Sequence, residues 1–351
     1  VLVESFNAAL SAADPLKVVP PHLPAPPKGR TVVVGAGKAA ASMALAVEQH
    51  WPSGAPLEGL VVTRYGHGLL TNRIRVAEAG HPLPDEAVTH SAQTIRQLVR
   101  GVRKEDLLLV LVSGGGSSLL GLPADGVALA DMRRVGDALL KCGAPVQKIN
   151  VVRKHLSPLL GGNLAAQCKG KVCALIISDV TGDDPSDIAS GPCAGDPSTY
   201  ADALSILAEY GIDPPQAIGN LLRRGASGLV PETPKPGDSR LHGVENILIA
   251  SSQTAIQAGA ESIRTRGIGA AILGDAVTGE ASQVAKMQAA LALQIAGHAE
   301  PWKAPIALVS GGECSVTVKG GGRGGRCSEF LLSFALAVEG PHAPRIWGLA
   351  C

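Results

Sequence analysis

Charged residues flanked by glycine are the feature of this sequence best suited to chemistry. The first group is Gly35-Ala36-Gly37-Lys38, which follows a valine run and leads into an alanine-rich stretch. Glycine permits tight turns and close backbone approach, and the N–H groups at a helix start favour anions. A phosphate or carboxylate ligand would offset the helix dipole, which disfavours a cation such as Lys38 in the first turn. The alternative interpretation is a solvated surface lysine.

The second group joins three consecutive glycines to hydroxyl side chains. It follows a run of aliphatic residues and consists of Ser113, Gly114, Gly115, Gly116, Ser117 and Ser118. Successive N–H groups in such a loop form a concave site suited to phosphate oxygens. The spacing is not that of a GxxxxGK[ST] P-loop. We predict that this loop binds a nucleotide or substrate phosphate.

The third group supplies carboxylates, with four aspartates at positions 179, 183, 184 and 187 after another aliphatic run. Carboxylates hold Mg²⁺, which keeps several of its waters, and a carboxylate can accept a proton from a substrate hydroxyl. Asp183 and Asp184 are equally suited to turn and N-cap positions. We predict Asp179 as the metal ligand and Asp184 as a catalytic residue.

The fourth group places arginine in glycine-rich sequence. Glu313 ends the segment Ser310-Gly311-Gly312-Glu313, and Arg323 and Arg326 follow within a glycine-rich loop. A guanidinium group at the start of a helix can hold phosphate or carboxylate with two parallel hydrogen bonds. We predict that Glu313 and Arg323 bind substrate or nucleotide and that Arg326 is catalytic; the alternative is a hairpin turn with exposed arginines.

These groups match the requirements of phosphoryl transfer, which needs a phosphate-binding loop, cations, Mg²⁺ and a carboxylate near the acceptor oxygen. The sequence has no GxSxG motif, so hydrolase chemistry is less favoured. The histidines at positions 67, 81 and 155 are each more often structural than catalytic. No cysteine and histidine cluster has the spacing of a zinc site.

The elements that must position these residues alternate between strand and helix. The predicted strands cover 30–34, 60–63, 73–78, 107–112, 172–178, 247–250, 270–273, 306–310, 315–318 and 346–350. The predicted helices cover 38–50, 85–101, 129–142, 201–210, 252–266, 280–297 and 326–339. Continuous aliphatic strands and this βαβα order indicate three-layer α/β domains with mostly parallel, Rossmann-like sheets. Ligands of such sheets bind beyond the carboxyl ends of the strands.

Composition limits the classes of function. The 351 residues carry 31 Lys and Arg against 30 Asp and Glu, and only nine are Phe, Trp or Tyr. Neither a basic excess nor aromatic stacking residues are present for nucleic-acid binding. No apolar run approaches the ~20 residues of a membrane helix. Seven scattered cysteines suit a reducing compartment. We expect a cytoplasmic monomer or homodimer that binds small molecules.

Two domains are expected from the length. A proline-rich connection between 213 and 243 indicates an N-terminal domain over 1–235 and a C-terminal domain over 240–351. The sequence stops inside the predicted strand 346–350, so we expect the C-terminal domain to be truncated.

Eight segments in order resemble the glycerate 2-kinase family, also known as the MOFRL family and often named hydroxypyruvate reductase. They are VVVGAGKAA, VTRYGHG, EAGHPLPDE, LVLVSGGGSSLL, INVVRKHLSPLLGGNLA, LIISDVTGDDPSDIASGP, ILGDAVTGEA, and ALVSGGECSVTV with GGGRGGR. The resemblance implies phosphorylation of D-glycerate to 2-phosphoglycerate with ATP and Mg²⁺. It also implies an active site in a cleft between two α/β domains.

The resemblance implies that Lys38 and Arg326 are the functional cations, with Arg323 as a neighbouring candidate. The chain departs from the family at Cys327-Ser328, where many members carry Asn-Gln, although Glu329 is retained. This departure is expected to alter the support of Arg326. The family also continues beyond Cys351 into an acidic, glycine-rich loop.

Two other functions compete with the kinase. An NAD(P)-dependent hydroxypyruvate reductase would use the Gly-Ala-Gly turn for its dinucleotide. The acidic residue expected about 20 residues later is poorly placed, because Glu48 lies in a predicted helix and Glu58 only precedes the next strand. A sensor that binds sugar acids or nucleotides without turnover would keep the anion-binding loops.

Overall fold

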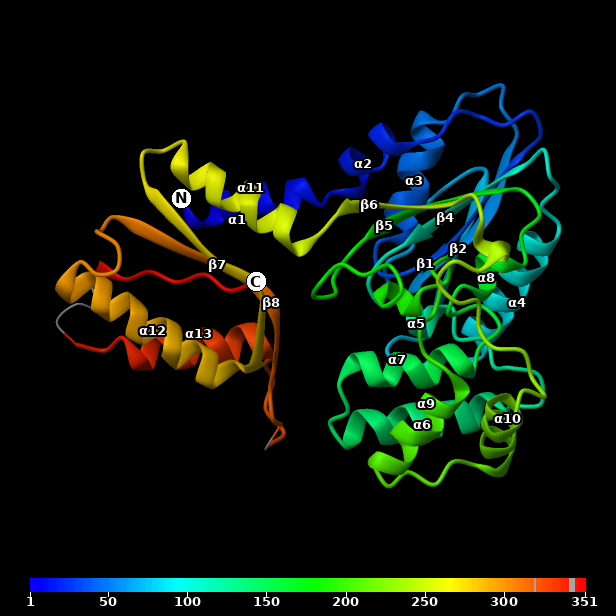
Figure 1. Ribbon diagram of the computed structural model, residues 1–351. Coiled ribbons are helices and arrows are strands. Elements are labelled where there is room, and N and C mark those ends of the chain that lie inside the picture. Colours follow the sequence, from blue (N-terminus) through cyan, green and yellow to red (C-terminus); the bar gives the residue numbers. More distant parts are fainter. Residues whose placement is uncertain (319, 341–344) are drawn as a thin grey trace. The chain divides into compact units, whose positions relative to one another are not determined.

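A computed structural model describes residues 1–318, 320–340 and 345–351. The chain forms two compact units (Figure 1). The larger unit is Pro15–Ile249, and the smaller unit joins Val1–Asp14 to Ala250–Cys351.

The larger unit is built on a six-stranded sheet with the order β3-β2-β1-β4-β5-β6. Its strands are β1 (Thr31–Ala36), β2 (Leu57–Arg64), β3 (Ile74–Ala79), β4 (Leu107–Val112), β5 (Lys171–Ile177) and β6 (Val244–Ala250). The pairings of β1 with β2 and β4, of β2 with β3, and of β4 with β5 are parallel. The loops after β1, β4 and β5 therefore leave the same edge of the sheet.

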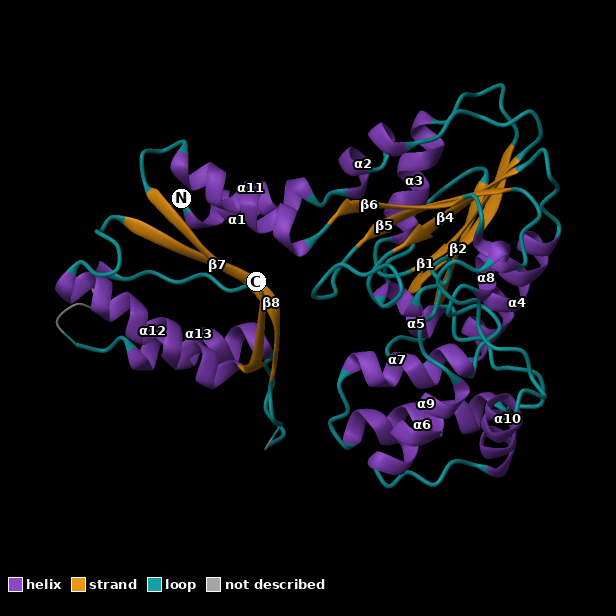
Figure 2. Ribbon diagram, viewed as in Figure 1, coloured by secondary structure: helices purple, strands orange, loops and turns teal. Residues whose placement is uncertain are grey.

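Helices and short 3-10 turns connect these strands (Figure 2). The helices are α2 (Pro15–Val18), α3 (Ala40–His50), α4 (Glu86–Arg100), α5 (Gly116–Leu119), α6 (Leu129–Lys141), α7 (Val146–His155), α8 (Asn163–Ala166), α9 (Tyr200–Glu209) and α10 (Gln216–Ala226). The 3-10 turns are Pro20–His22, Ile188–Ser190 and Ser239–Leu241.

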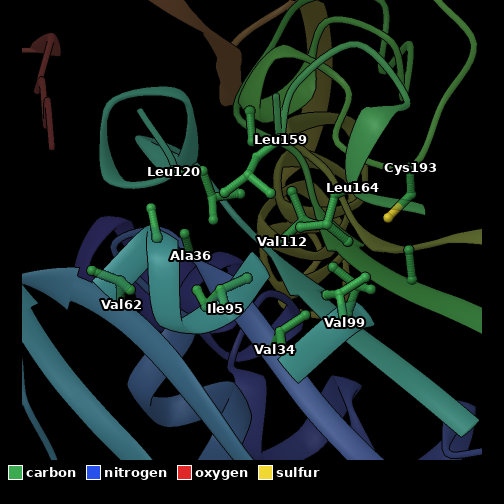
Figure 3. Close-up of a cluster of buried hydrophobic side chains, with 14 of the residues drawn as sticks. Val34, Ala36, Val62, Ile95, Val99, Val112, Leu120, Leu159, Leu164 and Cys193 are labelled. Atoms are coloured by element: carbon green, nitrogen blue, oxygen red, sulfur yellow. The ribbon is translucent and has the colours of Figure 1, made fainter. Parts of the chain in front are cut away.

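Both faces of the central strands are buried, which explains their unbroken aliphatic runs. Val32 and Val34 of β1 belong to a core that includes residues of α4, whereas Val33 packs with residues of α3. Figure 3 shows Val34 gathered with Ile95 and Val99 of α4. A third core joins α6, α7, α9 and α10 into a separate helical layer of the larger unit.

The smaller unit is a βαβ arrangement with added helices. Its elements are α1 (Leu2–Ala12), α11 (Ser252–Arg264), β7 (Gly269–Glu280), α12 (Ala281–His298), β8 (Ile306–Ser315) and α13 (Arg326–Ala337). Strands β7 and β8 pair in parallel, as a crossover through a helix requires. Helix α1 packs on α11, where Ser5 Oγ donates a 3.0 Å hydrogen bond to the Gly259 carbonyl.

The prediction of an α/β protein with mostly parallel sheets is confirmed, but two predicted strands are wrong. The predicted strand 315–318 is absent, because β8 ends at Ser315, where its partner β7 is followed by helix α12 at Ala281. After the end of β8, Thr317 donates hydrogen bonds to the Glu280 carboxylate instead of pairing with a strand. Residues 346–350 form no strand, and Gly348 lies against Leu331 and Phe334 of α13.

Three further features differ from the sequence analysis. Helix α7 was not predicted, and its last turn contains Arg153, Lys154 and His155. Helix α1 was also missed, and it packs with the C-terminal part of the chain. The compact units divide after Ile249, because the proline-rich connection leads into β6 of the larger sheet. Among the described residues, no helix is long and apolar enough to cross a membrane.

Candidate active site

The turn after β1 brings Lys38 against the glycine loop that follows β4. Gly37 has a φ of +141°, and a Cβ atom there would lie 2.1 Å from Ser113 Oγ. The Lys38 N–H donates a 2.8 Å hydrogen bond to the Gly114 carbonyl, and the Ala39 N–H donates to Ser113 Oγ at 3.1 Å. Glycine is required at position 37 by both the left-handed φ and the close approach.

The glycine loop itself leaves backbone donors available. Gly115 has a φ of +84°, and helix α5 begins directly after it. Within the part of the chain that the structure describes, the N–H groups of Gly114 and Gly115 donate no hydrogen bond to protein atoms. Neighbouring N–H groups with no protein partner are suited to bind an anion.

Asp179, the second residue after β5, lies at the same edge of the sheet. Its Oδ2 atom is 4.0 Å from Lys38 Nζ, and each of these side chains is about half exposed, at 51% and 46%. A Cβ atom on Gly114 would lie only 1.8 Å from Asp179 Oδ2. The three loops after β1, β4 and β5 therefore place an ammonium group, free N–H groups and a carboxylate side by side.

His81 is a member of this group that the sequence analysis did not single out as catalytic. Its Nε2 atom would lie 2.6 Å from a Cβ atom on Gly115. Burial lowers the pKa of the His81 imidazole, and the positive charges of Lys38, Arg64 and Arg153 lower it further. A neutral imidazole can donate or accept a hydrogen bond beside the glycine loop. No spacing in the sequence relates this histidine to residue 115.

The serines that end the glycine loop have different environments. Ser118 Oγ donates to the Gly115 carbonyl at 3.1 Å, which closes the loop on itself. Ser117 Oγ lies 2.8 Å from Ser190 Oγ, which lies 3.0 Å from Oδ1 of the buried Asn150. Ser190 has a positive φ of 57°, a strained conformation for a residue with a side chain. The Ser117 hydroxyl is therefore held by a hydrogen bond from Ser190.

Asp184 is exposed and bound to its own loop. Its Oδ1 atom accepts a 2.8 Å hydrogen bond from the Ser186 N–H, and its carbonyl accepts from Asp187. The structure describes no contact between Asp184 and Lys38; the carboxylate within 4.0 Å of Lys38 Nζ is that of Asp179. Asp184 also borders a separate cavity of about 360 Å³. Its local geometry matches the turn interpretation.

Asp179 is the described carboxylate that lies beside the glycine loop at this edge. Among the described residues, no three His, Cys, Asp or Glu side chains gather as a metal site does. Mg²⁺ is usually bound through one or two carboxylates and completed by phosphate oxygens and water. Asp179 fits the part of a single carboxylate ligand beside a phosphate-binding loop.

Two of the predicted site residues in the smaller unit, Glu313 and Arg326, lie in contact with each other. Arg326 begins α13, and its Nη1 atom pairs with the Glu313 carboxylate of β8; both side chains are at least half exposed. Ser328, part of the departure from the family pattern, caps the helix, since its Oγ accepts from the Gly325 N–H at 2.9 Å. Arg323 is exposed. The structure thus joins Arg326 to Glu313.

Family models match both parts of the chain. Residues 1–223 match a family described as a domain of unknown function, DUF4147, and residues 306–351 match the MOFRL family. The first match covers more than half of the chain.

Named relatives are similar over most of their length. A protein of Agrobacterium vitis named as a hydroxypyruvate reductase is 46% identical over 100% of this chain and 78% of its own. The glycerate 2-kinase of Pyrococcus horikoshii is 41% identical over 87% of this chain and 69% of its own. The crystal structure of glycerate kinase from Thermotoga maritima superposes with a TM-score of 0.83 at 37% identity, over 96% and 79% of the two chains. The chain therefore belongs to the glycerate 2-kinase family, which joins a DUF4147 domain to a MOFRL domain.

Proposed function

We propose that this protein transfers the γ-phosphoryl group of ATP to the C2 hydroxyl of D-glycerate and forms 2-phosphoglycerate with Mg²⁺. The observation that carries the proposal is the meeting of Lys38, the N–H groups of Gly114 and Gly115, and Asp179 at one edge of the sheet. Membership of a kinase family agrees with this chemistry, because two relatives are named as glycerate 2-kinases.

Phosphoryl transfer needs little covalent participation from the protein, so positioning and charge stabilisation supply most of the catalysis. The free N–H groups of the glycine loop bind phosphate oxygens, and the Lys38 ammonium stabilises the charge that spreads over the transferred group. Asp179 binds Mg²⁺, which neutralises phosphate charge when bound. In this proposal Ser113, Gly116, Ser117 and Ser118 shape the loop and Gly37 sets the turn.

Glycerate, the acceptor of the phosphoryl group, requires residues that bind its carboxylate and accept the proton of its hydroxyl group. Arg326 and Arg323 are proposed to bind the carboxylate of glycerate, with Glu313 holding the Arg326 guanidinium in place. Asp184 is proposed to accept the proton of the C2 hydroxyl, although its carboxylate is engaged with Ser186. The position of the active site between two domains stays a prediction.

The reductase alternative needs an acid for the ribose of the dinucleotide, and both candidates are otherwise engaged. The Glu48 carboxylate accepts backbone hydrogen bonds from Asn72, Arg73 and Ile74. Glu58 pairs with Arg30. Neither carboxylate is available to bind a ribose hydroxyl in the manner of a dinucleotide-binding fold.

A pair of coupled assays on the purified protein tests the proposal. We expect release of ADP when D-glycerate, ATP and Mg²⁺ are supplied together, and no oxidation of NADH or NADPH with hydroxypyruvate. Oxidation of the reduced nucleotide without ADP release would establish the reductase instead. Binding of both substrates without either reaction would favour the sensor.

A further inference from the structure

A second group of cations lines a cavity of about 600 Å³ in the larger unit. Four arginines border it, namely Arg96 and Arg100 of α4, Arg224 of α10, and Arg240. None of the glycine-loop residues borders this cavity. Its volume lies within the usual range of small-molecule sites.

The arginines of α4 lie far from Lys38. Helix α4 follows β3, so it begins near the carboxyl ends of the strands and returns to their amino ends. Its 15 residues correspond to about 22 Å of helix. At its far end, Arg30 Nη2, just before β1, donates to the Gly101 carbonyl at 3.0 Å. Arg100 therefore lies at the edge of the sheet opposite to the glycine loops.

Arg96 and Arg100 are held together by one amide oxygen. Both Nε atoms donate to Gln167 Oε1, at 3.1 and 3.0 Å. The Gln167 Nε2 atom donates in turn to the carbonyls of Pro158 and Asn163, both at 2.8 Å, which fixes the orientation of the amide. The network therefore brings two like charges to the same acceptor. Mutual repulsion makes such an arrangement unfavourable until an anion lies between the charges.

Little protein charge offsets these arginines. Arg240 is neutralised by Asp238, whereas Arg96 faces the exposed Asp125 at 3.9 Å. Arg100 and Arg224 have no carboxylate within 4.0 Å among the residues that the structure describes. The four arginines therefore carry more positive charge than the two carboxylates that pair with them can offset.

A lysine and three apolar side chains also line the cavity. Buried Lys154 lines the cavity, and its Nζ atom lies 3.3 Å from Asp196 Oδ1 and 3.8 Å from Asp187 Oδ1. These two carboxylates neutralise Lys154, so the attraction for an anion comes from the arginines. Leu221, Val230 and Pro231 add apolar lining, which suits the carbon skeleton of a ligand.

We propose that this cavity binds a phosphate-bearing small molecule with at least two negative charges, at a site separate from the glycine loops. Guanidinium groups bind phosphate oxygens through parallel charge-assisted hydrogen bonds. The arginines would bind the phosphate of such a ligand, and the apolar lining would contact its organic part. This site does not depend on the function proposed above.

Calorimetric titration with inorganic pyrophosphate tests the site, because this probe carries the required charge in a compact form. We expect binding by the wild-type protein, and at least tenfold weaker binding after the double change Arg96→Gln and Arg100→Gln. Arg224→Gln should weaken binding as well. Arg223→Gln is the matched control, because Arg223 lies on the same helix but outside the cavity, where it donates to Asn220.

Two further measurements keep the test decisive. Thermal unfolding without ligand shows whether each variant is folded, and Arg224 is exposed, so its replacement should leave the fold intact. Pyrophosphate binding should persist in Lys38→Met. The proposal is overturned if the wild type does not bind pyrophosphate at millimolar concentration, or if Lys38→Met abolishes all binding. It is also overturned if the affinity for pyrophosphate is unchanged in Arg224→Gln and in the double variant, or if Arg223→Gln lowers that affinity as much as they do.

Discussion

Lys38 is proposed to stabilise most of the charge that develops during the reaction, and its contacts are compatible with that role. Its backbone is held by Gly114, while the ammonium group remains 46% exposed and near Asp179. A cation that is fixed at its base and accessible at its tip can meet a phosphoryl group without costing the fold much stability. The chemistry and the stability of this residue are therefore separable by mutation.

Replacing Lys38 with methionine should lower kcat about 10²–10³-fold, because a donor to the developing charge is removed. The unfolding temperature should change little, since an exposed ion pair contributes about 0–1 kcal/mol. Steady-state ADP release and thermal unfolding measure the two effects. Activity within threefold of the wild type would exclude Lys38 from the reaction.

His81 should make the stability of the protein depend on pH. Its pKa in the folded chain is lowered from an ordinary value of 6.5, first by burial and then by Lys38, Arg64 and Arg153. Below pH 6.5 the unfolded chain takes up a proton that the folded chain resists. The contribution of His81 to the free energy of unfolding is therefore fully present above pH 6.5 and is lost as the pH falls below it.

Urea unfolding of the wild type and of His81→Asn, at several values between pH 7.5 and about pH 5, measures this contribution. We expect the free energy of unfolding to fall less steeply with acidification in the variant. Parallel pH dependences in the two proteins would show that His81 is not responsible.

At the scale of elements, parallel strands bring distant loops together, and this rule made part of the site predictable. The valine run within the predicted strand 30–34 and the aliphatic run at 107–112 indicated buried strands, and the glycines after them indicated loops at one edge. The contact of Gly114 with Asp179 follows from that topology. The hydrogen bonds of Asn72 to Glu48 and of Arg96 to Gln167 could not be predicted from the topology, because contacts of side chains far apart in the sequence leave no periodic signal.

A side chain at position 114 should displace the Asp179 carboxylate. Gly114→Ala would place Cβ 1.8 Å from Asp179 Oδ2, so the loop or the carboxylate must move. We expect kcat to fall by about 10²-fold, as misplacement of reacting groups by about 1 Å can cause. Kinetics of ADP release provide the measurement.

Gly136→Ala in α6 is the matched control, because its added Cβ would meet no atom within 4 Å. Alanine in a helix interior should raise the free energy of unfolding by about 0.5–1 kcal/mol and leave activity unchanged. Equal activity in the two glycine variants would contradict the proposed role of the loop.

At the scale of the whole molecule, the candidate residues are divided between two compact units. Lys38, the glycine loop and Asp179 belong to the larger unit, and Glu313 and Arg326 to the smaller. The alternation of strands and helices predicted the fold class of both units. It could not predict that α1 joins the C-terminal part of the chain, because that packing depends on residues about 250 positions apart, such as Ser5 and Gly259.

The central claim is phosphoryl transfer to the C2 hydroxyl of D-glycerate, and phosphorus NMR of the reaction mixture tests it most directly. The protein is incubated with D-glycerate, ATP and Mg²⁺, and the proton coupling of the new phosphate signal identifies the carbon that carries it. We predict a doublet, from a phosphate on the C2 methine, together with ADP. A triplet from a phosphate on the C3 methylene, or no new phosphate ester, would contradict the account.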